Sequence, residues 1–336
     1  MTGKSIRPIS RALVVGGGIG LRHLSNLQAI LPNVELRLLS THSDISHASK
    51  KIELIADLEA ARLFNPQITI VANPATYHAQ VISHLASTGT AFLIEKPLAA
   101  SLADAEVIKE QALFFSSLVM VGYNLRFSQS LNFFKDLIDQ KKFGEVITVR
   151  ADVGQDLRTW RPEVDFRKSV SAQKLLGGGV LLELSHEIDY LSWIFGDIQH
   201  VNSLVGMISQ LDTDVEDFAF IHLVTKSGVP ISLSMDFFRQ GKSRECIVVL
   251  EDVTLKWDGI AGSVSTLSLN GEWEILKIWV EDLVGTYTSE MKYFLDCVFT
   301  GAIPQCNLGS AIKTIKIIEE IKSNSKVLNR SHVSAD

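Results

Sequence analysis

Hydrophobic and polar positions follow two alternating periods over the first 123 residues. Short apolar runs typical of buried strands cover residues 11–15, 34–40, 68–73, 91–97 and 117–123. Between these runs, apolar residues recur at helical spacing over residues 19–31, 53–64, 75–88 and 102–113. Gly89 ends the third of these helices. Alternation of this kind predicts a parallel sheet covered on both faces, with ligands at the carboxyl ends of its strands.

The pattern changes after residue 124, where the helix–strand alternation stops. The remaining predicted segments are, in order, a helix near 127–139, a strand at 145–154, an irregular polar stretch at 155–174, a helix after the glycines at 177–179, mostly strands over 198–280, and two helices near 286–299 and 308–323. A run of strands separated by short turns predicts an antiparallel sheet. We therefore expect domains at residues 1–123 and 124–336, with the helix at 308–323 as a candidate to pack back on the first domain.

Composition excludes several classes of protein. The chain has 336 residues, 46% apolar and 21% charged, so two domains with large cores are expected. The net charge is −6 and no basic run is present, which argues against nucleic acid as a partner. No apolar stretch reaches the roughly 18 residues of a membrane span, and the N-terminus lacks a signal-peptide core. The three cysteines form no C-x-x-C pair, so we expect a cytoplasmic protein without disulfides or a metal site.

The glycine-rich turn after the first strand reads "VVGGGIG". In the usual dinucleotide-binding spacing, Gly16 and Gly18 would be followed by a glycine at position 21, but the third glycine is Gly20. Counting back from Gly20 gives Gly17 and Val15, so either alignment is one residue out. A pyrophosphate needs backbone N–H groups at a helix N-terminus more than a set glycine count. We interpret residues 16–20, Ile19 included, as a shortened cradle; a plain glycine turn is the alternative.

Two further strand ends carry candidate residues. Glu95, Lys96 and Pro97 follow the strand at 91–97, where a doubly wound sheet presents its ligands. A surface lysine at a strand end is the equally weighted alternative. The stretch "NPATYH" follows the strand at 68–73, and its Asn73 and Pro74 are candidates for contact with a cofactor ribose. An ordinary helix start explains this stretch slightly better.

A polar stripe is predicted on the helix after the triple glycine. Treated as one helix at about 100° per residue, residues 177–196 place Glu183, His186, Glu187 and Tyr190 on one side. A satisfied core histidine is the simple explanation. Carboxylates at Glu183 and Asp189, three residues before and after His186, favour a functional histidine instead.

The polar stretch "RTWRPEVDFR" mixes aromatic and charged side chains; these are Arg158, Trp160, Arg161, Asp165 and Arg167. Such a set suits a polar, ring-shaped or anionic ligand. It suits an ion-paired loop at a subunit contact equally well.

Taken together, these motifs resemble one family, the glucose-fructose oxidoreductase / inositol dehydrogenase / rhizopine catabolism (Gfo/Idh/MocA) oxidoreductases. The matching stretches are "IGLRH", "NPATYH", "EKP", "GYNLRF" at 122–127 and "GGG…E…H..D" at 177–189, in the family's order over about two-thirds of the chain. The resemblance implies an N-terminal Rossmann parallel sheet, then an α+β domain with an open, mostly antiparallel sheet. It also implies a homo-oligomer, a dimer or tetramer, formed through that second sheet.

The activity implied by the resemblance is NAD(P)-dependent hydride transfer at a secondary alcohol or ketone of a sugar, cyclitol or saccharide precursor. Lys96 takes the place of the family's catalytic lysine, His186 of its acid/base, and Glu183 of its usual aspartate. The spacing from Glu183 to His186 is one residue short, which turns a helix by about 100°. The implied cofactor contacts are Gly16, Gly17, Gly18, Ile19, Gly20, Ser40, Thr41, Asn73, Pro74, His78, Glu95 and Lys96. The implied substrate contacts are Tyr123, Asn124, Arg126, Trp160, Arg161, Asp189 and Tyr190.

The choice of cofactor depends on the end of the second strand. Proteins that bind NAD often carry an acid there, about 20 residues past the glycines, to hold the ribose 2′-hydroxyl. Ser40 and Thr41 stand at this point and Asp44 comes late, which favours NADP while leaving NAD open. Two other functions remain alternatives: an NAD-using glycoside-cleaving enzyme of the same fold, and a dinucleotide- or sugar-sensing regulator without catalysis.

Overall fold

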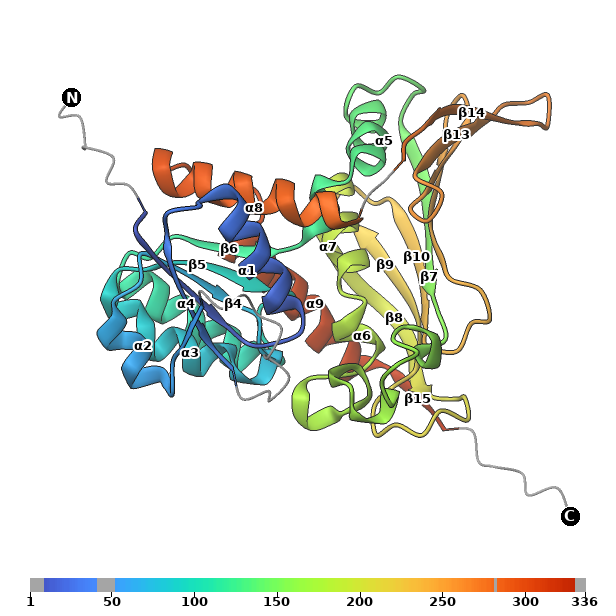
Figure 1. Ribbon diagram of the computed structural model, residues 1–336. Helices are drawn as coiled ribbons and strands as arrows, with labels where there is room; N and C mark the ends of the chain where they lie inside the picture. Colours follow the sequence, from blue (N-terminus) through green and yellow to red (C-terminus); the bar gives the residue numbers. More distant parts are fainter. Residues whose placement is uncertain (1–8, 41–51, 281–282, 330–336) are drawn as a thin grey trace, which may run out of the picture. The chain divides into compact units, whose positions relative to one another are not determined.

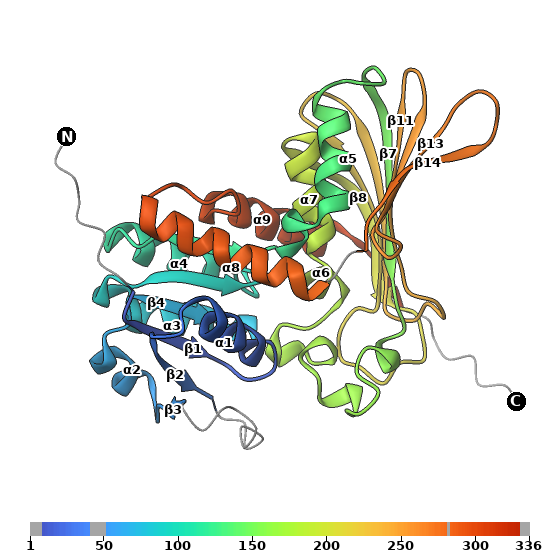
Figure 2. The ribbon, with the colours of Figure 1, turned by 45° about the horizontal axis from the view of Figure 1, so that its top comes forward.

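The computed structural model describes residues 9–40, 52–280 and 283–329 (Figures 1 and 2). The chain divides into two compact units. The first comprises residues 1–124 and 284–315, and the second comprises residues 125–283 and 316–336.

The first unit is built on a six-stranded parallel sheet of order β3-β2-β1-β4-β5-β6. Its strands are β1 (Arg11–Val15), β2 (Glu35–Leu39), β3 (Glu53–Leu54), β4 (Ile68–Val71), β5 (Ala91–Glu95) and β6 (Val119–Gly122). Its helices are α1 (Ile19–Ile30), α2 (Leu58–Phe64), α3 (His78–Leu85), α4 (Leu102–Phe114) and α8 (Leu283–Thr300). The predicted parallel, doubly wound arrangement is confirmed.

Two helical layers cover this sheet (Figure 1). Helices α2, α3 and α4 pack side by side. Helices α1 and α8 also contact each other, because the Thr288 hydroxyl donates to Asn26 and the ring of Tyr287 meets His23 edge-on. Right-handed crossovers that leave β1 in opposite directions place successive helices on opposite faces. Ligand-binding groups are therefore expected at the carboxyl ends of the strands.

The predicted helix over 53–64 is wrong in its first part. Glu53 and Leu54 form a short edge strand beside β2, and the helix begins only at Leu58. Asp57 sets this start because its carboxylate accepts the N–H of Ala60 at 2.8 Å. Pairing with β2 thus outweighs the helical spacing of the apolar residues.

The second unit is built on a nine-stranded sheet of order β14-β13-β12-β11-β7-β10-β9-β8-β15. Its strands are β7 (Val146–Gly154), β8 (Ile198–Met207), β9 (Phe218–Thr225), β10 (Pro230–Asp236), β11 (Ser243–Leu250), β12 (Thr254–Asp258), β13 (Ser263–Leu267), β14 (Trp273–Ile278) and β15 (Lys326–Asn329). Within the described part of this second sheet only the β7–β10 and β8–β15 pairs are parallel, so the expected mostly antiparallel sheet is confirmed.

Helices cover one face of this second sheet (Figure 2). They are α5 (Gln129–Asp139), α6 (Val180–Glu183) and α7 (His186–Phe195), while α9 (Leu308–Asn324) runs from the first unit into the second. The buried Trp257 of β12 fixes α5 on the sheet, because its indole N–H donates to Ser130 at 2.7 Å. None of the described helices is both long enough and apolar enough to span a membrane.

The single helix predicted after the triple glycine is instead two helices. Helix α6 ends at Glu183 and α7 begins at His186, with Leu184 and Ser185 between them. A helical wheel therefore does not carry across this break, and Glu183 and His186 do not share the predicted stripe. The break falls where the spacing between the two residues is one residue short.

Candidate active site

The glycines after β1 have separate structural roles. Gly16 has a φ of +112°, and a Cβ there would lie 2.5 Å from the backbone of Ala72 at the end of β4. Gly20 lies inside α1, where a Cβ would meet the side chain of Val14 at 3.2 Å. Gly16 thus allows the tight turn, and Gly20 allows α1 to pack closely on the sheet. The third glycine works one position earlier than in the usual spacing.

The N-terminus of α1 is open to an anion. Gly18 is the exposed N-cap, and nothing lies within 4 Å of the place where its Cβ would be. The first turn carries no acidic side chain. The positive end of the helix is therefore exposed, as a pyrophosphate requires, while the N–H groups of Gly20 and Leu21 already donate to the carbonyl oxygens of Gly17 and Gly18 at 2.8 and 3.2 Å. Gly17 and Ile19 are half-buried beside this N-cap.

Near the end of β4, two buried side-chain oxygen atoms receive no hydrogen bond from the described residues. Asn73 Oδ1 and Thr76 Oγ1 are buried, and neither has a hydrogen-bond partner among the described residues. Pro74, between them, is half-buried. Unpaired buried acceptors are unfavourable unless a ligand supplies donors, and the hydroxyl groups of a ribose are suitable donors. These residues fit a dinucleotide cofactor.

The three motif-bearing strand ends stand side by side in the sheet. Val15 of β1 pairs with Val71 of β4, and Val71 pairs with Ile94 of β5. The glycine turn, Asn73 and Lys96 therefore leave the same carboxyl edge from three adjacent strands. Ser40 follows β2 at this edge, whereas Thr41 and Asp44 lie outside the described residues.

His78 has a structural role instead of the cofactor contact expected from the sequence. It is buried, with Nδ1 3.0 Å from the carbonyl oxygen of Leu98 and Nε2 2.8 Å from that of Asn73. Both ring nitrogens are thus occupied by backbone, which ties the end of β4 to the segment after Lys96. Burial lowers the pKa of His78.

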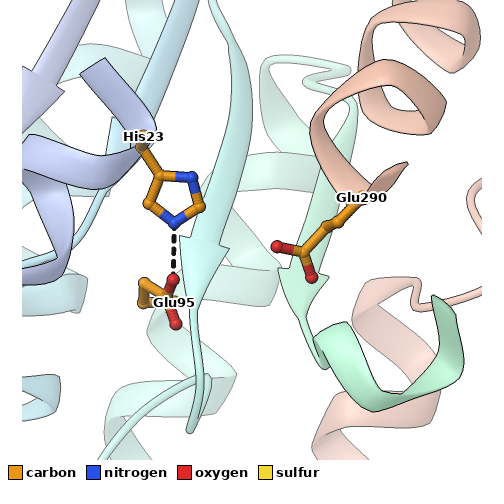
Figure 3. Close-up of side chains that lie close together, drawn as sticks. All are labelled: His23, Glu95 and Glu290. Atoms are coloured by element: carbon orange, nitrogen blue, oxygen red, sulfur yellow. Dashed lines mark hydrogen bonds and ion pairs between the residues drawn. The ribbon is translucent and has the colours of Figure 1, made fainter. Parts of the chain in front are cut away.

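Glu95, which precedes Lys96 in the chain, belongs to a buried cluster with His23 and Glu290 (Figure 3). Glu95 Oε1 lies 2.5 Å from His23 Nε2, and Glu95 Oε2 accepts the backbone N–H of Lys96 at 3.3 Å. Glu290 of α8 directs its carboxyl group at Glu95. One side-chain nitrogen or oxygen atom from each of His23, Glu95 and Glu290 lies within 4.8 Å of the other two. Burial, and then the charge of Glu95, raise the pKa of Glu290 well above that of an exposed glutamate.

Sequence reasoning did not select His23 or Glu290 as site residues. A usable signal exists for both. His23 lies next to Leu24 and four residues before Leu27 on the buried face of α1, and Glu290 lies four residues before Phe294 on the buried face of α8. A charged or titratable residue on an otherwise apolar helix face needs a partner.

In the second unit, His186 is the first residue of α7 and is buried. Glu183 accepts the hydroxyl hydrogen of Ser171 at 2.9 Å, which holds it on the other side of the helix break. Glu187, fully buried, pairs with the Nε of Arg244 at 2.7 Å. Glu183 and Glu187 thus each have a partner outside α7.

Several residues predicted to contact a substrate are buried and have partners within the chain. Arg126 and Asp189 form a buried bidentate ion pair, with N–O distances of 2.8 and 2.7 Å. Asn124 is also buried and donates to Thr286 at 2.8 Å. Tyr123 and Tyr190 are completely buried, and the ring of Tyr190 packs edge-on against Trp257. A contact between these side chains and a substrate stays a prediction.

The polar stretch at 158–167 is largely ion-paired within itself. Arg158 pairs with Asp156 at 2.5 Å, and Arg167 pairs with Asp165 at 2.8 Å. Arg161 is exposed. The indole N–H of Trp160 is buried and has no partner among the described residues, while its ring packs on Phe237. Trp160 and Arg161 stay candidates for contact with a substrate.

A hollow of about 610 Å³ in the first unit lies away from these motifs. Its lining includes Ser10, Gln67 and Gly89, next to the starts of β1, β4 and β5. It is therefore at the opposite edge of the sheet from Lys96 and is not part of the candidate site.

Comparison with protein families identifies both halves of the chain. Residues 10–123 match the model of an oxidoreductase family with an NAD-binding Rossmann fold, and residues 132–256 match the GFO/IDH/MocA C-terminal domain. The chain belongs to the Gfo/Idh/MocA oxidoreductases. The family resemblance drawn from the motifs is thereby confirmed, and the first unit is an NAD(P)-binding Rossmann domain.

Similar proteins in this family include inositol dehydrogenases. The inositol 2-dehydrogenase of Acidiphilium cryptum is 24% identical over 302 residues, which cover 86% of this chain and 85% of that protein. The inositol 2-dehydrogenase/D-chiro-inositol 3-dehydrogenase of Lacticaseibacillus casei is 23% identical, covering 85% of this chain and 83% of that protein.

Solved structures share the fold along almost the whole chain. KijD10, a 3-ketoreductase from Actinomadura kijaniata in complex with NADP and TDP-benzene, has a TM-score of 0.81 at 19% identity, covering 96% of this chain and 99% of that chain. A levoglucosan dehydrogenase in complex with NADH has a TM-score of 0.83 at 15% identity, covering 94% of this chain and 96% of that chain.

Proposed function

We propose that this protein transfers a hydride between a nicotinamide cofactor and a secondary alcohol or ketone of a sugar, a cyclitol or a related saccharide precursor. The observation that carries the proposal is the shared edge of three adjacent strands, which brings the glycine turn, the unpaired Asn73 acceptor and Lys96 together. Inositol dehydrogenases among the relatives support a polyhydroxylated ring as substrate.

The cofactor would be held by residues of the first unit. The N–H groups at the start of α1 would bind the pyrophosphate, with Gly18 leaving space for it. Asn73 and Thr76 would accept hydrogen bonds from a ribose. When bound, the nicotinamide ring supplies the position that gives or takes the hydride.

Two side chains are assigned to the reacting carbon–oxygen group. His186 takes the hydroxyl proton in the direction of oxidation and returns it in the direction of reduction. Lys96 donates a hydrogen bond to the same oxygen and stabilises the negative charge that develops there. Glu183 is left out of the proton transfer, because it is bonded to Ser171 beyond the helix break.

We favour NADP as the cofactor. Leu39 and Ser40 end β2 without a carboxylate, so the described part of this edge contains no group that would repel a 2′-phosphate. Titration of the purified protein with NADPH and NADH, followed by fluorescence, decides between the two.

The kinetic experiment uses a panel of inositols, sugars and keto-sugars with either cofactor. We expect Lys96→Ala and His186→Ala each to lower kcat/KM by about 10²-fold or more, because a positioned acid/base contributes about 10²–10⁴-fold. His84→Ala and Lys109→Ala are matched controls, since His84 is exposed and Lys109 lies in a surface ion pair. Losses below about fivefold in both site variants would show that the assignment is wrong.

The same assay separates this function from its alternatives. Net change in cofactor absorbance with turnover identifies a dehydrogenase or reductase. Cleavage of a glycoside without net cofactor reduction identifies the glycoside-cleaving reaction, and binding of cofactor or sugar without turnover identifies a sensor.

We also propose that the protein is a homo-oligomer formed through the second sheet. Strand β14 is exposed along its whole length, and it carries the exposed apolar side chains Trp273, Ile275 and Ile278. Further along the same sheet, Ile147 on β7 and Val201 and Met207 on β8 are also exposed. An exposed apolar edge strand favours pairing with another chain.

A further inference from the structure

Glu290 is completely buried, yet neither oxygen of its carboxyl group has a hydrogen-bond partner among the described residues. Its carboxyl group is directed toward Glu95 (Figure 3). A buried, ionised and unpartnered carboxylate is strongly unfavourable in a protein interior. Glu290 must therefore either carry a proton or share a cation with its neighbours.

The contacts of the neighbouring groups favour the proton. Both oxygens of Glu95 are already in use, one by His23 at 2.5 Å and the other by the backbone N–H of Lys96 at 3.3 Å. A metal ion would compete for these same atoms and would displace the short contact to His23. A proton on Glu290 needs only an additional hydrogen bond to Glu95, and a carboxylate oxygen accepts more than one.

We propose that Glu290 is a positioning residue that keeps its proton in the native protein and donates it in a hydrogen bond to Glu95. Glu95 is then held from two sides, by His23 of α1 and by Glu290 of α8, and it fixes Lys96 through the backbone N–H of that residue. One Glu290 oxygen lies within 4.8 Å of a ligand atom of each of the other two groups, so rotation of the Glu290 side chain would complete the bond. The role given to Lys96 rests on the proposed function.

The proposal predicts a loss of function at alkaline pH. In the described structure, Glu95 from β5 and His23 from α1 each have a ligand atom within 4.8 Å of a Glu290 oxygen. Tyr287, whose ring contacts His23, and Arg22, which stacks over Tyr287, are the next neighbours. Once Glu290 ionises, two negative carboxylates face each other without a cation between them, and the hold on Glu95 is lost.

The first test looks for the proton itself. Infrared difference spectra between the wild type and Glu290→Gln at neutral pH should show the carbonyl stretch of a protonated carboxylic acid, shifted on deuteration and missing from the variant. Asp296→Asn is the matched control, because Asp296 is an exposed carboxylate on the same helix. Metal analysis of the untreated protein is run alongside.

The second test measures turnover and amide hydrogen exchange, which report how firmly the segment around Lys96 is held. Glu290→Gln can still donate to Glu95, so it should keep kcat within about twofold of the wild type and lose the alkaline decline. Glu290→Leu cannot donate, so kcat should fall about ten- to hundredfold, and amide hydrogen exchange over residues 91–98 should rise. The exchange measurement and the infrared band need no turnover, so they remain decisive if the proposed activity fails.

Three results would overturn the proposal. They are the absence of a carboxylic-acid band, a stoichiometric metal that disappears in Glu290→Gln, and a Glu290→Leu variant with unchanged turnover and exchange. If Glu290→Leu does not fold, the infrared band and the pH profile of Glu290→Gln decide.

Discussion

At the scale of single residues, backbone conformation and close contacts determine which positions of the turn after β1 require glycine, and the spacing of the glycines in the sequence does not show them. Gly16 is restricted twice, by a positive φ and by the backbone of Ala72 at the end of β4. Gly18 is restricted by its φ of +52° alone, because the space around it is open. The shortened motif therefore keeps the tight turn at Gly16 and the close packing of α1, the latter at a glycine one position earlier than usual.

We expect Gly16→Ala to destabilise the protein by about 2–4 kcal/mol, because the new methyl group adds overpacking against rigid backbone to the strain of a positive φ. Cofactor affinity should fall with it, since the turn carries the start of α1. Gly89→Ala is the control, with a φ of +74° and nothing within 4 Å of the added Cβ, and it should cost only about 1 kcal/mol. Urea unfolding measures both, and equal losses would contradict the close-contact argument.

At the scale of elements, the second unit places α7 through a buried ion pair. Arg126, just before α5, holds Asp189 of α7 with two hydrogen bonds, and its guanidinium also lies 5.3 Å from the ring of Trp193. His186 begins the same helix. The orientation of the proposed acid/base thus depends on a pair that lies one turn further along.

We expect Arg126→Met and Asp189→Leu each to lower the free energy of unfolding by about 3–5 kcal/mol, because each leaves a buried charge without its partner. The double variant should lose less than the sum of the two, since it leaves no unpaired charge. Lys141→Ala is the control: it breaks an exposed pair with Glu145 and should cost less than about 1 kcal/mol. Additive losses in the double variant would show that the two side chains are not coupled.

At the scale of the whole molecule, the exposed edge of the second sheet predicts association. We expect the wild type to sediment as a dimer or larger species, and Ile275→Lys with Ile278→Lys to shift it toward the monomer. Leu113→Lys is the control, because Leu113 is exposed on α4 of the first unit and does not belong to that sheet. A wild-type monomer at micromolar concentration would contradict the proposal.

Much of the fold could be predicted from the sequence, because strands and helices have short periods. The alternation over residues 11–123 predicts the parallel sheet, and the run of strands after residue 198 predicts the antiparallel one. The errors fall where a local pattern competes with another interaction. Pairing with β2 removes residues 53–54 from a predicted helix, and the break at Leu184–Ser185 divides another.

What the sequence determined by itself is the set of chemical groups at the strand ends, namely the glycine turn, Asn73 and Lys96. A strand end is local, so its residues can be read in order. Only the tertiary structure decided which side chains are taken up by partners. Arg126 is paired with Asp189, His78 with two carbonyl groups, and Glu95 faces Glu290 from far along the chain. These contacts join segments that are distant in the sequence, so the local periodic pattern of apolar residues does not predict them.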